Sequence, residues 1–219
     1  NYLLADGLFD LYRNRWIGVM EKDERDYLVS FNLEEEFQRP NILYEAADFL
    51  GYAVLSPHSD RLAWVEWQKP YMPWDSSQIC LGSLDGMGEL LFPSRLKKIK
   101  AFNTEQNSIF QPMWLRNGEL VFVEESSGWW NLAVIAADLL EDSFAEFRKP
   151  WPMKVELGSP QWISGISTIS QIDNGILALG CEEAKWSMQT FYQNGIVKKL
   201  ALPFHNLTSL SSEKHKAVA

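Results

Sequence analysis

Residues 116–123, which read RNGELVFV, contain the pattern that decides the fold of this chain. An Asn-Gly dipeptide next to an apolar run is the strongest short-range signal for a β-hairpin turn. The same arrangement occurs at Asn174-Gly175, where the run GILAL covers residues 175–179. Both stretches therefore predict antiparallel strands that follow tight turns at equivalent places of a repeated pattern.

Working outward from this stretch, we find four copies of one unit. Strands that follow a polar turn are predicted at residues 15–20, 61–67, 119–123 and 175–179. A polar or aromatic loop and a further strand come next, at residues 27–31, 78–84, 132–136 and 188–192. A last edge segment closes each unit, at residues 42–44, 89–91, 145–147 and 197–200. The basic stretch at residues 94–100 is interpreted as a solvated linker between units.

The spacing of the copies predicts the fold class. Matched positions (Trp16, Leu62, Leu120 and Ile176) are 46, 58 and 56 residues apart. Repeats of about 40–50 residues with four strands each are typical of β-propeller blades, and longer loops account for the longer spacings. We therefore predict an all-β fold, a partial β-propeller of about four four-stranded blades plus the start of a fifth. A tandem of unrelated β-modules is the alternative, and the matched turns in four consecutive units argue against it.

The predicted blades cover residues 5–47, 48–100, 105–152 and 158–202, and the next blade begins at residues 203–219. This last unit stops inside its second strand. We therefore expect the chain to be a piece of a longer protein.

Composition excludes several classes of protein. The 219 residues include 20 basic and 29 acidic side chains, a net charge of −9, whereas nucleic-acid binding needs a basic surface. The longest purely apolar run covers only residues 132–137, against about 20 residues for a membrane-spanning helix. Cys80 and Cys181 form neither a disulfide framework nor a zinc ribbon. The two thiols could pair with each other, but we interpret them as separate buried cysteines in a reducing compartment. We therefore expect a cytoplasmic protein that contacts neither nucleic acid nor membrane.

The loops between the second and third strands of each unit share one face of a propeller. They are acidic, and they cover residues 21–26, 68–77, 124–131 and 181–186, of which the last three contain tryptophan. Exposed aromatic rings among carboxylates suit a peptide, a positively charged ligand end or another domain. The alternative is that these rings pack between blades and the acids are ordinary surface. Our candidate substrate- or domain-facing residues are Trp74, Asp75, Glu124, Glu125, Trp129, Trp130 and Trp186.

Catalytic and metal-binding patterns are missing from the sequence. A nucleophile elbow needs Gly-x-Ser-x-Gly, which does not occur. Adjacent acids such as Glu124-Glu125 and Glu182-Glu183 are poor glycosidase candidates, because neighbours in a strand point to opposite faces. No histidine pair has metal-ligand spacing, and no glycine-rich phosphate loop follows a strand. We therefore expect no catalytic residue, no metal and no cofactor in this chain.

Several short segments occur together in an order that is typical of one family. They are residues 62–67 (LAWVEW), 72–75 (MPWD), 108–114 (SIFQPMW), 127–132 (SGWWNL), 158–162 (GSPQW) and 202–204 (LPF). Because these segments occur in this order, the chain resembles the N-terminal β-propeller of prolyl oligopeptidase family serine peptidases. The branch it resembles is the acylaminoacyl-peptidase or dipeptidyl-peptidase-like one. The resemblance begins near Ala5 and covers essentially the whole chain. The blade turns at residues 56–59 (SPHS) and 115–118 (LRNG) depart from the family's usual Ser-Pro-Asp-Gly.

This resemblance implies a seven- or eight-bladed propeller that covers the active site of a C-terminal α/β-hydrolase domain, which is absent from this chain. There a Ser-Asp-His triad would cleave short peptides. The chain itself would be the gating and substrate-screening domain, and its partners would be that hydrolase domain and peptide substrates. The alternative is a non-enzymatic propeller that serves as a protein-interaction platform. Because an open ring leaves apolar flanks uncovered, self-association through the blade flanks is also expected.

Overall fold

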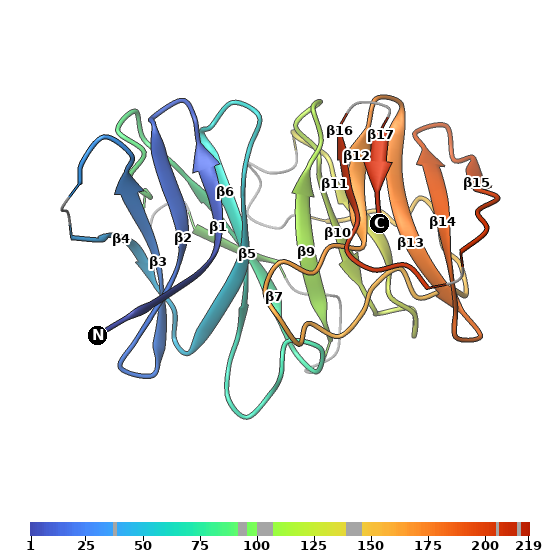
Figure 1. Ribbon diagram of the computed structural model, residues 1–219, viewed down its shortest axis with the longest axis horizontal. Coiled ribbons are helices and arrows are strands. Elements are labelled where there is room, and N and C mark those ends of the chain that lie inside the picture. Colours follow the sequence, from blue (N-terminus) through green and yellow to red (C-terminus); the bar gives the residue numbers. More distant parts are fainter. Residues whose placement is uncertain (37–38, 92–95, 100–106, 139–145, 205, 214–215) are drawn as a thin grey trace.

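The computed structural model describes residues 1–36, 39–91, 96–99, 107–138, 146–204, 206–213 and 216–219 (Figure 1). All regular elements within these residues are β-strands. The first sheet contains β1 (Leu3–Asp10), β2 (Arg15–Lys22), β3 (Arg25–Asn32) and β4 (Asn41–Glu45). The second contains β5 (Phe49–Leu55), β6 (Arg61–Trp67), β7 (Gln78–Ser83) and β8 (Leu96–Ile99).

The later sheets follow the same plan. The third contains β9 (Ile109–Trp114), β10 (Leu120–Glu124) and β11 (Asn131–Ile135). The fourth contains β12 (Ile169–Ile172), β13 (Gly175–Glu182), β14 (Lys185–Tyr192) and β15 (Val197–Lys199). A last pair consists of β16 (Ser211–Glu213) and β17 (Lys216–Val218). Every sheet is an antiparallel meander in chain order, which confirms the predicted all-β propeller fold.

The prediction that residues 89–91 form the edge strand of the second sheet was wrong. Residues 89–91 fold back on residues 83–85, with a bridge between Leu84 and Leu90, and do not form the sheet edge. That edge is β8, which pairs with β7 and lies within the stretch interpreted as a linker. In the third sheet the edge is a single bridge from Val134 to Arg148. The edge predicted at residues 145–147 begins at a residue outside the described part of the chain.

The hydrophobic core lies between neighbouring sheets. Successive residues of a strand point to opposite faces, and β6 shows the consequence. Leu62 and Trp64 belong to a cluster shared with the first sheet, whereas Ala63 and Val65 belong to a cluster shared with the third and fourth sheets. All four side chains are fully buried. Each middle sheet is therefore covered on both faces by its neighbours, as the blades of a propeller are.

Bulges in the first strands link consecutive sheets. Asp6, Tyr52 and Gln111 each have a left-handed φ between 50° and 57°, at the place where the pairing of β1, β5 or β9 with the next strand shifts register. The Asp6 carboxylate accepts a hydrogen bond from the Tyr52 backbone N–H of the next sheet. The Gln111 side-chain oxygen likewise accepts one from Thr168 N, 2.9 Å away. The bulge of one sheet therefore positions the first strand of the next.

Two substitutions at Asp6 separate its hydrogen bond from its charge. Burial raises the pKa of Asp6 above its ordinary value of 3.8, and the hydrogen bond from Tyr52 lowers it in part. Ionised Asp6 therefore destabilises the fold at neutral pH, and this cost declines as the pH falls through the folded pKa and vanishes below the unfolded value. We expect Asp6→Ala to lose about 1–2 kcal/mol in urea unfolding, because Tyr52 N loses its acceptor. Asp6→Asn, which keeps an acceptor, should match or exceed the native stability at pH 7 and lose that advantage at acid pH. Equal losses for both variants would contradict this account.

The two ends of each sheet carry different connections between strands. We call the end that carries the connections between second and third strands the loop face; it lies along the lower edge of Figure 1 for β2–β3, β6–β7 and β13–β14.

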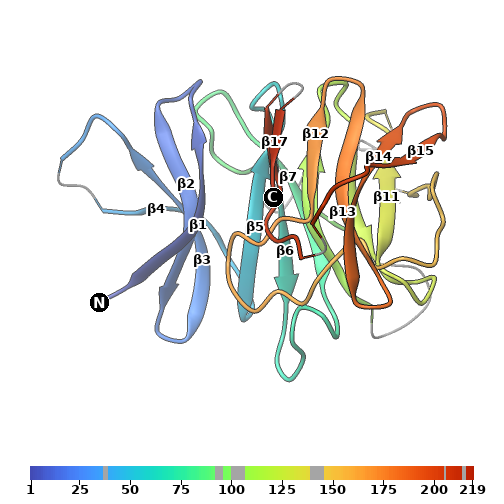
Figure 2. The ribbon, with the colours of Figure 1, turned by 45° about the vertical axis from the view of Figure 1, so that its right-hand side comes forward.

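Figure 2 shows the β16–β17 hairpin beside β12, where the Ser170 and Ser212 hydroxyls are 2.6 Å apart. Exposed apolar side chains gather on β1 and the turn after it, at Leu3, Leu4, Phe9, Leu11 and Tyr12. Self-association through this flank stays a prediction.

Candidate functional site

A cavity of about 370 Å³ lies on the loop face between the third and fourth sheets. Three segments build it: the β10–β11 loop, the chain before β12, and the β13–β14 hairpin. Its lining is Glu125, Gly128, Trp129, Trp130, Glu156, Gly158, Ser159, Pro160, Cys181 and Trp186. Three tryptophans and two glutamates therefore line one space, which we call the loop-face pocket.

Trp130 is held firmly in this pocket. Its ring packs edge-on against Phe110, with centroids 5.3 Å apart. Its backbone N–H donates to Glu156 at 2.8 Å, and its indole Nε1 donates to Glu125 at 3.1 Å. A Cβ at Gly158 would come within 2.9 Å of this indole and 2.5 Å of Phe110, so only glycine lets the wall approach so closely. The pocket thus has a preformed aromatic wall.

Glu125 sets the charge of the pocket. Burial raises its pKa above the usual 4.5, hydrogen bonds from Ser108 N and Trp130 lower it in part, and the charges of Glu156 and Glu124 raise it further. The Ser108 N–H lies 2.6 Å from Glu125 Oε1. Carboxylates held close together in a partly buried site favour the approach of a cation, which would relieve their mutual repulsion.

Glu124 does not face the pocket. Its side chain is fully buried, with Oε1 2.9 Å from Lys149 Nζ and Oε2 accepting a hydrogen bond from Ser126 N at 2.9 Å. The second sheet repeats this arrangement, because buried Glu66 is 3.0 Å from Lys98 Nζ. Glu124 is therefore paired with Lys149, and it does not belong to the pocket lining that includes Glu125.

Trp74 and Asp75 lie beside the pocket and not in its lining. The Trp74 ring packs on Trp162, with centroids 4.3 Å apart and planes tilted by 47°. Asp75 is exposed, and its carboxylate closes a turn by accepting from Met72 N at 3.0 Å. Ser108 connects this loop to the pocket, because its hydroxyl donates to the Pro73 carbonyl at 3.0 Å while its N–H bonds Glu125.

Of the seven candidate residues, the structure brings four together in one cavity: Glu125, Trp129, Trp130 and Trp186. Their role in binding stays a prediction. Sequence reasoning missed Glu156, Cys181 and Trp162, which come from segments outside the predicted loops or at their border. The segment that contains Trp162 was noted only for its family resemblance, since no spacing rule pairs it with Trp74.

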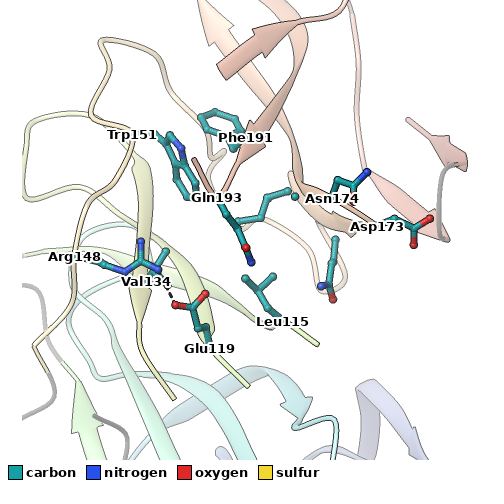
Figure 3. A pocket seen from close by; sticks show the side chains of 12 residues that line it. Leu115, Glu119, Val134, Arg148, Trp151, Asp173, Asn174, Phe191 and Gln193 are labelled. Atoms are coloured by element: carbon teal, nitrogen blue, oxygen red, sulfur yellow. Dashed lines mark hydrogen bonds and ion pairs between the residues drawn. The ribbon is translucent and has the colours of Figure 1, made fainter. Parts of the chain in front are cut away.

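A second, smaller cavity of about 200 Å³ opens at the opposite end of the same two sheets (Figure 3). Arg148 and Glu119 form an ion pair of 2.7 Å on one side of it, and Trp151 packs edge-on against Phe191, with centroids 5.6 Å apart. Ligand pockets usually have about 300–1,000 Å³. The loop-face pocket is therefore the better candidate site.

The described residues offer little for other kinds of site. Within them, no group of three His, Cys, Asp or Glu side chains is arranged to hold a metal ion. Among these same residues there is no helix long and apolar enough to cross a bilayer. Both cysteines are free; Cys80 is buried and Cys181 is half-buried at the pocket.

Comparisons with known proteins support the fold. No protein-family model and no curated protein sequence matches this chain. A solved puromycin-hydrolysing peptidase of Mycobacterium tuberculosis matches 99% of it with a TM-score of 0.85 and 20% identity. A puromycin hydrolase matches 99% with a TM-score of 0.85 and 19% identity. Prolyl oligopeptidase B from Galerina marginata, bound to a 35mer hydrolysis and macrocyclisation substrate, matches 98% with a TM-score of 0.72 and 12% identity.

The chain spans about a third of the length of these enzymes, namely 34%, 33% and 29%. At this level of identity the match concerns the fold. The resemblance to the propeller of prolyl oligopeptidase family peptidases that the sequence indicated is confirmed at that level.

Proposed function

We propose that this chain, whose fold is that of the propeller part of the peptidases above, screens peptide substrates for a serine peptidase and is not itself catalytic. The observation that carries the proposal is the loop-face pocket, which is lined by three tryptophans and two glutamates. The propeller would exclude large folded proteins by size. A hydrolase domain of the same polypeptide, in the cytoplasm, would perform the cleavage.

The pocket suits the positively charged end of a short peptide. Indole faces attract ammonium groups, and the attraction grows when water is excluded. Glu125 and Glu156 add negative charge at the wall that holds Trp130. A ligand amine placed here would be held by cation–π contact and by charge-assisted hydrogen bonds. Holding one end of a peptide fixes its orientation, and orientation together with exclusion of water would favour acyl transfer on the hydrolase domain.

The charge of Glu125 leads to a pH-dependent prediction. We expect the tripeptide Ala-Phe-Ala to quench tryptophan fluorescence and to bind more tightly than its N-acetylated form. Binding should weaken as the pH falls through the raised pKa of Glu125, because the protonated acid no longer attracts the amine. Glu125→Gln should weaken binding of the free-amine peptide about tenfold and leave the acetylated peptide unchanged.

Glu182→Gln is the matched control, because Glu182 is exposed on the same face and does not line the pocket. This variant should bind both peptides as the native chain does. Equal binding of the free and acetylated peptides by the native chain at every pH would contradict the proposed chemistry.

The proposed peptide cleavage by a hydrolase domain of the same polypeptide has a separate test. A fluorophosphonate probe labels activated serines, so we expect it to label a natural gene product longer than this chain and to leave this chain unlabelled. A natural product that stays unlabelled would instead favour the non-enzymatic interaction platform.

A further inference from the structure

Residues 158–167 form a loop whose two ends are held together. The Thr168 hydroxyl donates to the Leu157 carbonyl at 2.7 Å, which joins the residues on either side of the loop. Leu157 N also donates to the Trp130 carbonyl at 2.8 Å, and Thr168 N donates to Gln111 at 2.9 Å. The loop is therefore a compact excursion from a fixed base, as Ω-loops are.

The tip of this loop reaches the second sheet. Trp162 and Ile163 are 73% and 70% exposed, although both are large and apolar. Trp162 packs on Trp74 of the β6–β7 loop, and the Ile163 carbonyl accepts a 3.4 Å hydrogen bond from the Tyr52 hydroxyl of β5. Figures 1 and 2 both show the orange segment before β12 running across toward this sheet. The tip thus crosses from the fourth sheet to the second.

The base of the loop borders the loop-face pocket. Gly158, Ser159 and Pro160 are part of the pocket lining, next to the half-buried thiol of Cys181. Past the tip, Gly165 has a φ of +79° and no atom within 4 Å of the place where a Cβ would stand. A left-handed glycine in open space lets the backbone rotate at little cost. One segment therefore forms a wall of the pocket, has a point of rotation, and meets the second sheet through Trp162 and Ile163.

We propose that residues 158–167 are a lid on the loop-face pocket, held closed by the contact between Trp74 and Trp162. Opening the lid widens the entrance and exposes Cys181. An aromatic pair of this kind changes an equilibrium by roughly two- to tenfold, so the contact is strong enough to bias the lid and weak enough to break. The nature of the ligand rests on the function proposed above; the motion of the lid does not.

Thiol labelling of the full 219-residue chain tests the lid. Cys80 is fully buried, so a disulfide reagent such as DTNB reaches Cys181 first, and Cys80 reacts only when the chain unfolds. We expect Trp162→Ala and Trp74→Ala each to raise the labelling rate of Cys181 roughly two- to tenfold. The double variant should exceed neither, because both changes remove the same contact. Phe204→Ala, which removes another exposed aromatic ring, is the matched control and should leave the rate unchanged.

Two results would overturn the lid. One is an unchanged labelling rate in both tryptophan variants, and the other is parallel faster labelling of Cys80, which would mean global unfolding. Adding Ala-Phe-Ala separates this proposal from the previous one. If the variants react faster but the peptide protects no thiol, the lid stands and the peptide site falls. If the peptide protects Cys181 but the variants react as the native chain does, the peptide site stands and the lid falls.

Discussion

Replacing Trp64 by alanine is expected to lower the free energy of unfolding by about 3–5 kcal/mol. Trp64 is fully buried and packs on Tyr44, with ring centroids 5.0 Å apart. It belongs to the cluster between the first and second sheets, so its removal leaves a cavity where two blades meet. Urea unfolding followed by far-UV circular dichroism measures the loss.

Two comparisons make the Trp64 prediction specific. Trp162→Ala removes the same side chain from an exposed position and should lose at most about 1.5 kcal/mol. Trp64→Phe keeps most of the volume and removes an indole N–H that is buried with no hydrogen-bond partner among the described residues, so its loss should be clearly below that of alanine. Similar losses for Trp64→Ala and Trp162→Ala would show that the seam between the first two sheets is not a core.

Lys149→Met is expected to cost about 3 kcal/mol, because it leaves the buried carboxylate of Glu124 without its cation. This figure is at the lower end of the range for broken buried pairs, since the lysine side chain is 30% exposed. The double variant Glu124→Gln with Lys149→Met should recover most of the loss, because it removes the unpaired charge as well. Urea unfolding of the two single variants and the double variant gives the coupling between the residues.

Other ion pairs of the same chain serve as references for Lys149. Lys98→Met should cost less, because the Lys98 side chain is 43% exposed whereas that of Lys149 is 30% exposed, so water screens the Lys98 pair more. Arg116→Met breaks an exposed pair with Asp173 and should change stability by less than about 1 kcal/mol. A loss at Arg116 as large as that at Lys149 would contradict the importance of burial.

Most strands that could be predicted from the sequence have side chains buried on both faces, and the exposed edge strands β4 and β15 are the exceptions. Within β6 and β10 the runs from 62 to 65 and from 120 to 123 are continuous apolar stretches after turn residues, and the structure places them at the centre of the sheets. β8 was missed because an outermost strand needs little apolar surface. Its sequence, LKKI, resembles a charged linker, and only pairing with β7 identifies it as a strand.

The candidate site was predictable as a face but not as a pocket. Repeat spacing places the loops of Trp130 and Trp186 on one end of the propeller, and in the structure both rings line the same cavity. The spacing says nothing about the chain between repeats, so it could not identify Glu156 or the loop around Trp162. Burial also divides neighbours that look alike in sequence, because Glu125 lines the cavity while Glu124 is paired with Lys149.

Among the described residues the hydrophobic clusters lie between sheets, so no blade has a core of its own within that part of the chain. A single sheet cut out of the stack would carry Leu62 and Trp64 bare on one face and Ala63 and Val65 bare on the other. Adding or removing a whole repeat therefore leaves each remaining inner face covered by a neighbouring sheet, whereas adding or removing part of a repeat would leave an apolar face uncovered. The stability of each middle blade therefore depends on the two interfaces that it shares with its neighbours.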